Sequence, residues 1–433
     1  MNSKEFLKRR KQLMRMVGPG GIAILPSAPV RLRSRDVEYR FRQDSDFYYL
    51  TGFAEPDAVA VLAPGRDSGE YVLFCRDRDS GKELWDGSRA GPEGAVEHFD
   101  ADDAFPIDDI DDILPGIMES CSSVYYTIGA YGEFDRRMTE WVRSLRSRNA
   151  RGIHTPDEFV ALDHLLHDMR LYKSRAEISA MRRSAKIAVS AHTRAMIKVR
   201  PGMFEYEIEA EYVHEFRRHD ATDSYIPIVG TGANACTLHY VDNNAQLADG
   251  DLLLVDAGCE YDYYASDITR TFPVNGRFTP EQRAIYEIVL EAQLAAIEKT
   301  CIGNHWNDPH DAAVRVITRG LKKAGLLEGS LPKLIRQGAY REYFMHRTGH
   351  WIGMDVHDVG DYKVGDEWRL LESGMVTTVE PGIYIPASRK VPARWRNIGV
   401  RIEDDVAVTN SGPDVLSKGL VKEPDDIESL MAA

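Results

Sequence analysis

The sequence predicts an α/β protein made of two domains. The chain has 433 residues, more than one ordinary hydrophobic core accommodates, so two domains are expected. Short apolar runs typical of β-strands alternate with stretches typical of helices, which favours an α/β architecture. Near residue 170 a long helical pattern begins, and we place the domain boundary there. The expected domains are residues 1–168 and residues 169–433.

Composition and charge narrow the class of protein. Hydrophobic residues make up 43% and charged residues 28% of the chain, as in ordinary globular proteins. No apolar run approaches the roughly 18–20 residues of a membrane helix, so no membrane partner is expected. The formal net charge of −14 argues against a nucleic-acid partner, because proteins bind phosphates with lysine and arginine.

The five cysteines form no Cys-x-x-Cys pair, which argues against a zinc ribbon or a redox motif. Unpaired thiols are typical of a reducing compartment, so a cytoplasmic location is expected. The amino terminus, EFLKRRKQLMRMV, is basic but lacks the apolar run of a secretory signal, and a mitochondrial presequence is the alternative. The spacing of Phe6, Leu13 and Val17 predicts an amphipathic helix there.

The first domain carries three short strand-like runs, VAVLA, YVLFC and VYYTIG, with helical patterns between them. This alternation predicts a smaller α/β domain. The acidic stretch DADDAFPIDDIDDI, which precedes the third run, is expected to be a solvated loop and the start of a helix.

The second domain opens with a long amphipathic pattern, LYKSRAEISAMRRSAKIAVSAHTRAMIKV, which predicts a helix that Pro201 and Gly202 end. A second helix is predicted over EYEIEAEYVHEFRRH. Apolar strand-like runs follow at IPIVG, LLLVD, VTTVE and VRIEDDVAV. Two further helices are predicted near residues 279–299 and 308–325.

Two aspartates form the first pair of candidate metal ligands. The run LLLV predicts a strand buried on both faces, and Asp256 follows at its polar end. The chain then turns near Tyr261 and Asp262 and returns through YYASDITRTF. A tight hairpin with those two residues in its loop places Asp256 directly opposite Asp267, with Cβ atoms about 4.5–5.5 Å apart. Two like charges at that spacing destabilise the hairpin unless a cation lies between them.

Two glutamates form a second pair. The run MVTTVE is broken by Pro381, which leaves Glu380 at the end of a predicted strand. In VRIEDDVAV the apolar residues share one parity, whereas Arg401 and Glu403 share the other, so these two face away from the apolar layer. We therefore expect Glu403 to point into the same polar cavity, with Arg401 nearby as a fixed cation.

A histidine completes the set. His350 lies four residues after His346 in HRTGH, a segment that contains Gly349 and lacks the glutamate of an HExxH zinc helix. Taken alone, each carboxylate is typical of a solvated side chain, and the histidine is typical of a core residue. Together, four carboxylates and one imidazole suit divalent ions such as manganese, cobalt or zinc, because buried carboxylates need a neutralising cation. Five side chains are too few for two separate sites, so two ions that share carboxylates fit the set.

Several longer segments carry a resemblance to a known family. DAGCEYDYYASDITRTFPVNGRF, MHRTGHWIGMDVHDVG, TVEPGIYI and GVRIEDDVAVT resemble, in this order, the motifs of the aminopeptidase P and prolidase group of metallopeptidases. The segment EYRFRQDSDFYYLTGFAEPDAVAVL resembles the aminopeptidase P amino-terminal domain. The resemblance covers nearly the whole chain, and the nearest match within the group is the aminopeptidase P (Xaa-Pro aminopeptidase) family.

The resemblance implies a fold and a metal centre. The second domain is expected to be a pita-bread catalytic domain, whose two αβ halves are related by a pseudo-twofold axis, with the aspartates in the first half and the glutamates in the second. The first domain is expected to be the smaller aminopeptidase P-type α/β domain. Two divalent ions are implied, with manganese expected and zinc or cobalt as alternatives. Their implied ligands are Asp256, Asp267, His350, Glu380 and Glu403.

The resemblance also implies an activity, which is release of the amino-terminal residue from peptides with proline second, by a hydroxide that bridges the two ions. Glu380 is expected to accept a proton from this nucleophile. The implied catalytic residues are His239, His357, Glu380 and Arg401. The implied substrate-binding residues are His346, Tyr225, Tyr384 and Trp85. Trp85 is expected either to reach a neighbouring subunit's site or to serve packing alone, and a homodimer or homotetramer is expected.

Other functions on this fold are alternatives. Prolidase, which cleaves only Xaa-Pro dipeptides, shares every ligand and the domain layout, and a comparison of dipeptide with tripeptide turnover separates the two. Methionine aminopeptidase lacks the amino-terminal domain, and creatinase does not keep the five ligands. A binding module without catalysis, as in some histone-chaperone subunits, is disfavoured because this chain keeps all five.

Overall fold

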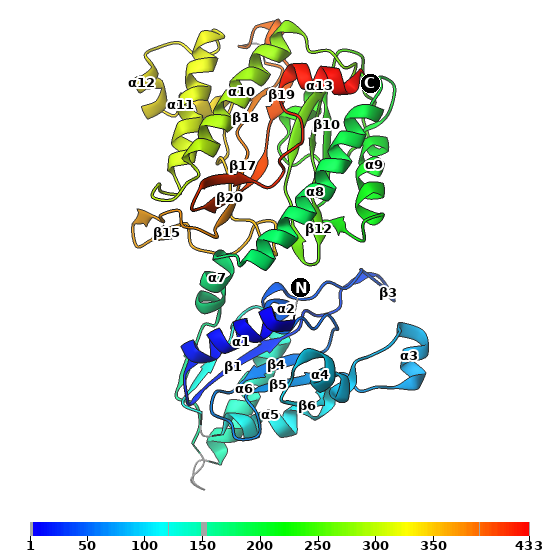
Figure 1. The fold of residues 1–433 in the computed structure, drawn as a ribbon, viewed down its shortest axis with the longest axis vertical. Helices are drawn as coiled ribbons and strands as arrows, with labels where there is room; N and C mark the ends of the chain where they lie inside the picture. Colours follow the sequence, from blue (N-terminus) through cyan, green and yellow to red (C-terminus); the bar gives the residue numbers. More distant parts are fainter. Residues whose placement is uncertain (1–2, 120, 149–153, 389, 433) are drawn as a thin grey trace. The chain divides into compact units, whose positions relative to one another are not determined.

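A computed structural model describes residues 3–119, 121–148, 154–388 and 390–432. The protein divides into two compact units, Met1–His167 and Asp168–Ala433 (Figure 1). Each unit combines helices with strands, which confirms the predicted α/β class. Among the described residues, none of the helices has the length and apolar character of a membrane span.

The first unit alternates short strands and helices. Its strands are β1 Gly21–Pro26, β2 Leu32–Ser34, β3 Val37–Glu38, β4 Val59–Leu62, β5 Tyr71–Cys75, β6 Asp103–Pro106, β7 Ser123–Tyr125 and β8 Glu158–Val160. Its helices are α1 Ser3–Val17, α2 Ser45–Thr51, α3 Ser80–Asp86, α4 Gly91–Phe99, α5 Ile110–Met118 and α6 Gly132–Ser147. Six of the strands form one mixed sheet in the order β6-β5-β4-β1-β7-β8.

The core of the first unit lies between this sheet and its helices. The runs VAVLA and YVLFC form β4 and β5, as predicted, and every residue of both strands is buried. The amphipathic helix predicted at the amino terminus is α1, which buries Phe6, Leu13 and Val17. The acidic stretch contains β6, a short 3₁₀ turn and the start of α5, so it carries one strand more than the sequence indicated.

Helix α7, Asp163–Leu171, crosses from the first unit into the second. The remaining helices of the second unit are α8 Arg175–Lys198, α9 Glu205–Arg217, α10 Pro280–Lys299, α11 Asp308–Lys323, α12 Leu331–Arg336 and α13 Pro424–Met431. Its strands are β9 Thr222–Asp223, β10 Ile228–Thr231, β11 Leu252–Asp256, β12 Cys259–Tyr261, β13 Tyr264–Ala265, β14 Thr269–Pro273, β15 Lys363–Val364, β16 Glu367–Trp368, β17 Val376–Val379, β18 Gly382–Ile385, β19 Ile398–Arg401, β20 Asp404–Thr409 and β21 Gly412–Val415.

Two helix pairs in the second unit each precede an antiparallel sheet. Helices α8 and α9 come before the sheet β10-β11-β14, and α10 and α11 come before the sheet β17-β20-β21. In Figure 1 the two helix pairs flank these strands. Capping boxes fix the first turns of α8, at Ser174 and Glu177, and of α10, at Thr279 and Gln282. All four predicted helices are therefore present, and α8 ends before Pro201 as expected.

The hairpin that carries the aspartates differs in register from the prediction. Its turn residues are Asp262 and Tyr263, with φ of 52° and 67°, which suits a two-residue type I′ turn. The turn therefore lies one residue later than expected, and Asp256 pairs with Thr269 rather than with Asp267. The partner of Asp256 thus shifts by two residues. Both aspartates still lie on one face, because side chains along a strand alternate with a period of two.

The two carboxylate-bearing regions are joined by direct hydrogen bonds. Glu403 N donates to Thr269 O at 3.1 Å, so the two-residue segment between β19 and β20 lies beside the start of β14. Asp267 N donates to Asp405 Oδ2, also at 3.1 Å. These contacts link residues more than 130 positions apart and bring the ends of both strand pairs to one place.

Candidate metal centre

A cavity of about 500 Å³ in the second unit brings the predicted ligands together. All five of them line it, and these are Asp256, Asp267, His350, Glu380 and Glu403. The same wall contains further residues that the sequence singled out, which are His239, His346, His357 and Arg401. Segments far apart in the sequence thus contribute to one site.

The two aspartates converge on a single hydroxyl group. Asp256 is the last residue of β11, and Asp267 lies in the link between β13 and β14. Gly258 lets these segments approach, because a Cβ there would lie 1.7 Å from Ser266 O. The Tyr225 hydroxyl lies 2.5 Å from Asp256 Oδ1 and 2.6 Å from Asp267 Oδ1. Since a phenol has one proton to donate, it satisfies one of these carboxylates at a time.

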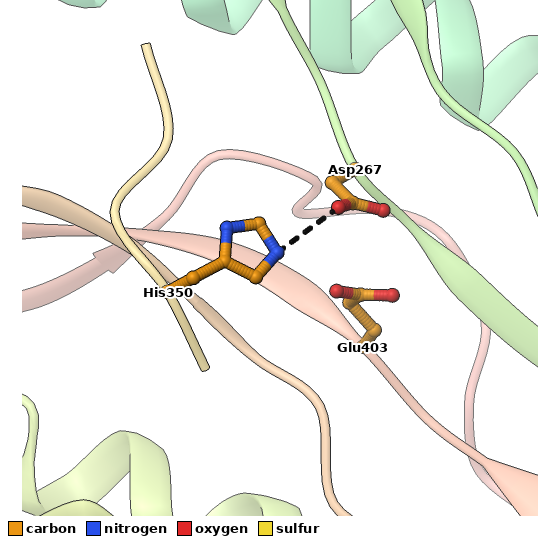
Figure 2. A group of neighbouring side chains, drawn as sticks. All are labelled: Asp267, His350 and Glu403. Carbon is orange, nitrogen blue, oxygen red and sulfur yellow. Dashed lines mark ion pairs between the residues drawn. The ribbon is translucent and has the colours of Figure 1, made fainter. Parts of the chain in front are cut away.

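His350 extends from a segment that runs along β17. Gly349 permits the close approach, since a Cβ there would lie 2.1 Å from Thr378 O. Thr378 N donates to His350 O at 3.0 Å. His350 Nδ1 lies 2.9 Å from Trp351 O, a carbonyl that only accepts, so Nδ1 carries the proton and Nε2 is directed to the carboxylates. Nε2 lies 3.3 Å from Asp267 Oδ2 (Figure 2).

The two glutamates occupy breaks between consecutive strands. Glu380 follows β17, and its Oε1 lies 3.7 Å from His350 Nε2. Glu403 follows β19, and its Oε2 accepts a hydrogen bond from Thr269 Oγ1 at 2.6 Å. One ligand atom from each of Asp267, His350 and Glu403 lies within 4.8 Å of the others, and Figure 2 shows the three side chains pointing toward one another.

The glutamates are electrostatically strained by this arrangement. Burial and then repulsion from Asp267, Glu380 and Asp256 hold the pKa of Glu403 well above its usual range. Burial raises the pKa of Glu380 to about 7, although His350 and Arg401 oppose the shift. Both groups therefore resist ionisation in the metal-free protein.

The aspartates and the histidine form a second set of coupled groups. Burial raises the pKa of Asp256 to about 6 against the lowering effect of Arg401. Burial acts in the same direction on Asp267, but the hydrogen bond with His350 outweighs it and lowers the pKa of Asp267. Burial alone would lower the pKa of His350, whereas Asp267 and Glu380 raise it to about 9. The imidazolium thus serves as a partial counter-charge.

These side chains fit a divalent metal. Carboxylate oxygens and an imidazole nitrogen are the donors that manganese, cobalt and zinc accept. Burial and neighbouring carboxylates raise the pKa of Asp256, Glu380 and Glu403, so the four carboxylates need more positive charge than one arginine and one imidazolium supply. A divalent cation supplies that charge, and the second unit is built to receive it.

Arg401 connects the carboxylates to the neighbouring aromatic residues. Its guanidinium donates from Nη2 to Asp256 Oδ2 at 2.7 Å and from Nη1 to the Tyr384 hydroxyl at 2.9 Å. Its Nε donates to Thr269 Oγ1 at 3.0 Å, and the same hydroxyl donates to Glu403. The side chain is 5% exposed, so this cation is held in place rather than mobile.

Besides His350, three histidines line the cavity, and they differ in environment. His346 Nε2 lies 2.9 Å from the Tyr384 hydroxyl, and burial with a further effect of Arg401 lowers the pKa of His346 to about 3. The ring of His357 lies 4.2 Å from that of His350, and burial followed by the charge of His350 lowers the pKa of His357. His239 follows a short 3₁₀ turn and is exposed at the cavity.

Three other residues that the sequence singled out do not line the cavity. Tyr384 is fully buried behind it and reaches the site through Arg401 and His346. Tyr225 reaches it through the aspartates. Trp85 belongs to α3 of the first unit, where 86% of its surface is exposed, and its contribution to a substrate site stays a prediction.

Sequence reasoning missed one part of the cavity wall. It consists of Trp306, Arg347, Tyr362 and Trp368. Trp306 precedes α11. Tyr362 directly precedes the small β15–β16 hairpin, and Trp368 lies within it. Nothing in the spacing of these residues brings them together, because the contact depends on how α11 and the hairpin pack.

A buried ion pair beneath the strands was also missed. Asp404 has the parity of the apolar residues of its strand, yet Arg270 Nη2 donates to it at 2.7 Å and Lys422 Nζ at 2.9 Å. Burial opposes ionisation here, but the fields of Arg270 and Lys422 hold the pKa of Asp404 below its usual range. A lone arginine in the apolar run TRTF was the available signal.

The fold and the carboxylate-rich centre together define a metallopeptidase. Residues 179–410 match metallopeptidase family M24, and residues 6–125 match the aminopeptidase P amino-terminal domain. The chain belongs to the aminopeptidase P branch of family M24. This confirms the resemblance and the pita-bread fold that the sequence motifs indicated.

Relatives match along the whole chain. The Xaa-Pro aminopeptidase of Escherichia coli K12 is 45% identical over 435 residues, which cover 100% of this chain and 98% of the relative. The Xaa-Pro aminopeptidase of Haemophilus influenzae is 43% identical over 429 residues, covering 99% of this chain and 97% of the relative. The structure of Pseudomonas aeruginosa aminopeptidase PepP is 58% identical, with a TM-score of 0.99 and coverage of 100% of this chain and 98% of that one.

Proposed function

We propose that this protein is a metallo-aminopeptidase that releases the amino-terminal residue from peptides with proline in the second position. The observation that carries the proposal is the convergence of four carboxylates and one imidazole on one cavity, in a chain 45% identical to an Xaa-Pro aminopeptidase over its full length. Residues 169–433 would form the catalytic domain and residues 1–168 the amino-terminal domain.

The proposed cofactor is a pair of divalent ions. Asp256, Asp267, His350, Glu380 and Glu403 would hold them. Manganese is our first choice, and zinc or cobalt are alternatives; a zinc-substituted aminopeptidase P from E. coli has a solved structure. When bound, such ions lower the pKa of a coordinated water from 15.7 toward about 7 and polarise the scissile carbonyl.

Glu380 is the proposed general base. A general base must lie within hydrogen-bond reach of the proton that it abstracts, and Glu380 lines the cavity together with the other proposed ligands. Its side chain is 18% exposed, so it faces the cavity while most of its surface is removed from water. Thr378 Oγ1 donates to Glu380 Oε1 at 3.3 Å and orients the carboxylate.

Arg401, His239 and His357 are the proposed partners of the substrate's charged and polar atoms. Arg401 is a permanent cation beside the carboxylates, so it can stabilise negative charge that develops at the reacting carbonyl. His357 has a lowered pKa and stays neutral near pH 7, which lets its N–H donate to a carbonyl oxygen without adding a charge. His239 is exposed at the same wall and is proposed for the same task.

Proline selectivity follows from the chemistry of the Xaa-Pro bond. That bond has no amide N–H, and the pyrrolidine ring fixes φ, so a site for general peptides loses a contact there. His346 presents a neutral ring at the cavity wall, held by Tyr384 and Arg401 behind it. We propose that His346 contacts the proline ring and that Tyr384 and Arg401 position His346.

Assembly and location follow the family. We propose a homodimer or homotetramer in the cytoplasm, with peptides as partners. E. coli aminopeptidase P has been solved with a substrate and with the inhibitor Pro-Leu, which supports a peptide ligand for this cavity. Trp85 is exposed on α3 and is a candidate for contact with a neighbouring subunit.

The experiment that tests this function compares peptides with purified protein, with and without added manganese. An Xaa-Pro-Xaa tripeptide should be cleaved after the first residue, and chelation followed by manganese should remove and restore turnover. A strong preference for Xaa-Pro dipeptides would instead identify a prolidase. A protein that binds no metal and cleaves neither peptide would be a binding module.

A further inference from the structure

Arg347 places a cation in the cavity wall that the proposed chemistry does not use. It follows His346 in the chain and lines the same cavity as the carboxylates. Its guanidinium carbon lies 5.0 Å from the centre of the Trp368 ring, and its Nη2 donates to Asn307 Oδ1 at 2.5 Å. The guanidinium is therefore held by a ring face and by an amide.

Both anchors of this arginine adjoin packed parts of the second unit. Asn307 directly precedes α11. Trp368 lies in β16 and packs with Tyr362 against a buried cluster that includes Trp306 and Trp351. Within that cluster the Trp306 and Trp351 rings are 4.3 Å apart. A guanidinium fixed in this way loses little conformational freedom when a ligand binds, which favours recognition.

The guanidinium has donors to spare. An arginine offers five N–H groups in a planar fork, and the Asn307 contact uses one of them. Among the described residues, Arg347 forms no ion pair, and Asp311 acts on it only through space. Arg401, by contrast, already pairs with Asp256. Arg347 is thus a preorganised cation in a substrate cavity without a carboxylate of its own.

The charge of the surroundings makes such a cation consequential. The chain carries a formal net charge of −14, so the protein as a whole repels anionic peptides. An anionic peptide entering this field is repelled unless a local cation offsets the repulsion. The fork of an arginine suits a carboxylate in particular, because two parallel N–H donors match its two oxygens.

We propose that Arg347 binds a carboxylate of the peptide substrate and so determines a preference for anionic Xaa-Pro peptides. This inference rests on the proposed aminopeptidase activity and adds a specificity residue to it. Two sources offer the same group, the terminal carboxylate of a short peptide and the side chain of an acidic residue. Arg347 distinguishes peptides by charge, whereas the pocket at His346 distinguishes them by the proline ring.

The test uses three pairs of peptides that differ only in one carboxylate, with manganese-loaded wild-type protein and Arg347→Gln. The pairs are Ala-Pro-Gly and its amide, Glu-Pro-Gly amide and Gln-Pro-Gly amide, and Ala-Pro-Glu amide and Ala-Pro-Gln amide. In at least one pair, wild-type kcat/KM should favour the anionic peptide about ten-fold, chiefly through KM. Arg347→Gln should bring that ratio to about one, and the responding pair identifies the source.

Lys363 provides the matched control. Its ammonium lies 4.8 Å from the same Trp368 ring but does not line the cavity, so Lys363→Gln removes an equal charge nearby and should keep the ratio. Arg347→Lys should retain part of the preference, and rising salt should weaken it. No preference in any pair, or a preference that survives Arg347→Gln, would overturn the proposal while proline-specific cleavage stands. Failure to cleave any of the six peptides would overturn the aminopeptidase function itself.

Discussion

Replacing Glu403 by glutamine should change stability in opposite directions with and without metal. The amide keeps the shape of the side chain and can still accept the hydrogen bond from Thr269 Oγ1, which is 2.6 Å in the wild-type protein. It also replaces a carboxyl group that burial and the neighbouring carboxylates keep from ionising in the metal-free protein with a group that is always neutral. The metal-free variant should therefore be at least as stable as the metal-free wild type, whereas the metal-bound variant should be less stable.

The size of the effect follows from ligand linkage. At a metal concentration 100 times Kd, binding stabilises the folded protein by about 2.7 kcal/mol. Removing a residue that merely supports a ligand weakens metal binding about 10–100-fold, so loss of a shared carboxylate should weaken it at least about 100-fold. The stabilisation then falls to about 0.4 kcal/mol. The difference of about 2.3 kcal/mol corresponds to a Tm change of about 5–9 °C for a unit of this size.

The assay is thermal unfolding of wild-type protein, Glu403→Gln and Glu367→Gln, each in chelator and in manganese. Glu367 is exposed on the β15–β16 hairpin, so its variant removes the same charge away from the site and should keep the full metal-induced shift in Tm. If Glu403→Gln kept that shift, or if it lowered the metal-free Tm by several degrees, the reasoning from clustered carboxylates would be wrong.

Three further outcomes follow from the same structure. Metal-free protein should lose stability between about pH 7 and about pH 9, because Asp267 and Glu380 raise the pKa of His350 to about 9, so the folded state keeps a proton that the unfolded state, whose histidines titrate near 6.5, has already released; a Tm that rose across this range in chelator would refute it. Arg270→Met should lower the free energy of unfolding, measured in urea, by about 3 kcal/mol, because it breaks the buried ion pair with Asp404 and Lys422 compensates that charge only in part. A loss under about 1 kcal/mol would contradict this. Gly349→Ala should lower both the Tm and the affinity for manganese, because the new Cβ would lie 2.1 Å from a backbone oxygen of β17. An unchanged manganese affinity in a calorimetric titration would contradict this prediction.

Three of the proposed metal ligands, Asp256, Glu380 and Glu403, were accessible from the sequence because each lies at or just after the end of a strand-like run. The run before Asp256 is buried throughout, and Pro381 ends the strand that carries Glu380. Parity then placed Glu403 on the face away from the apolar layer. A strand end or a break is a local property, and local properties are what periodicity reports.

The register of the first hairpin was not accessible in the same way. Choosing between a turn at Tyr261-Asp262 and one at Asp262-Tyr263 requires knowing which residues adopt positive φ, and neither pair contains the glycine that usually marks such a turn. The error moved the partner of Asp256 by two residues. Because two is the strand period, the prediction that both aspartates share a face survived the error.

Contacts between distant elements were beyond sequence reasoning. The wall that contains Arg347 and Trp368 depends on α11 and the β15–β16 hairpin lying next to the metal-binding segments. Asp404 has the parity of an apolar neighbour, and its contacts with Arg270 and Lys422 explain why it is ionised in the core. Both cases involve residues whose environment is supplied by chain far away in sequence.

The strand pattern and the metal chemistry have one common cause. Asp267, Glu380 and Glu403 all lie where a strand stops and the next has not begun, so their backbones are released from sheet pairing at the point where the side chains must meet. Continuous strands would hold these carboxylates at the fixed spacing of a ladder, with alternate residues on opposite faces. Breaks remove that constraint, and hydrogen bonds such as Glu403 N to Thr269 O rejoin the segments in a different geometry. The interruptions of the sheets are thus what allow carboxylates from both halves of the unit to face a single cavity.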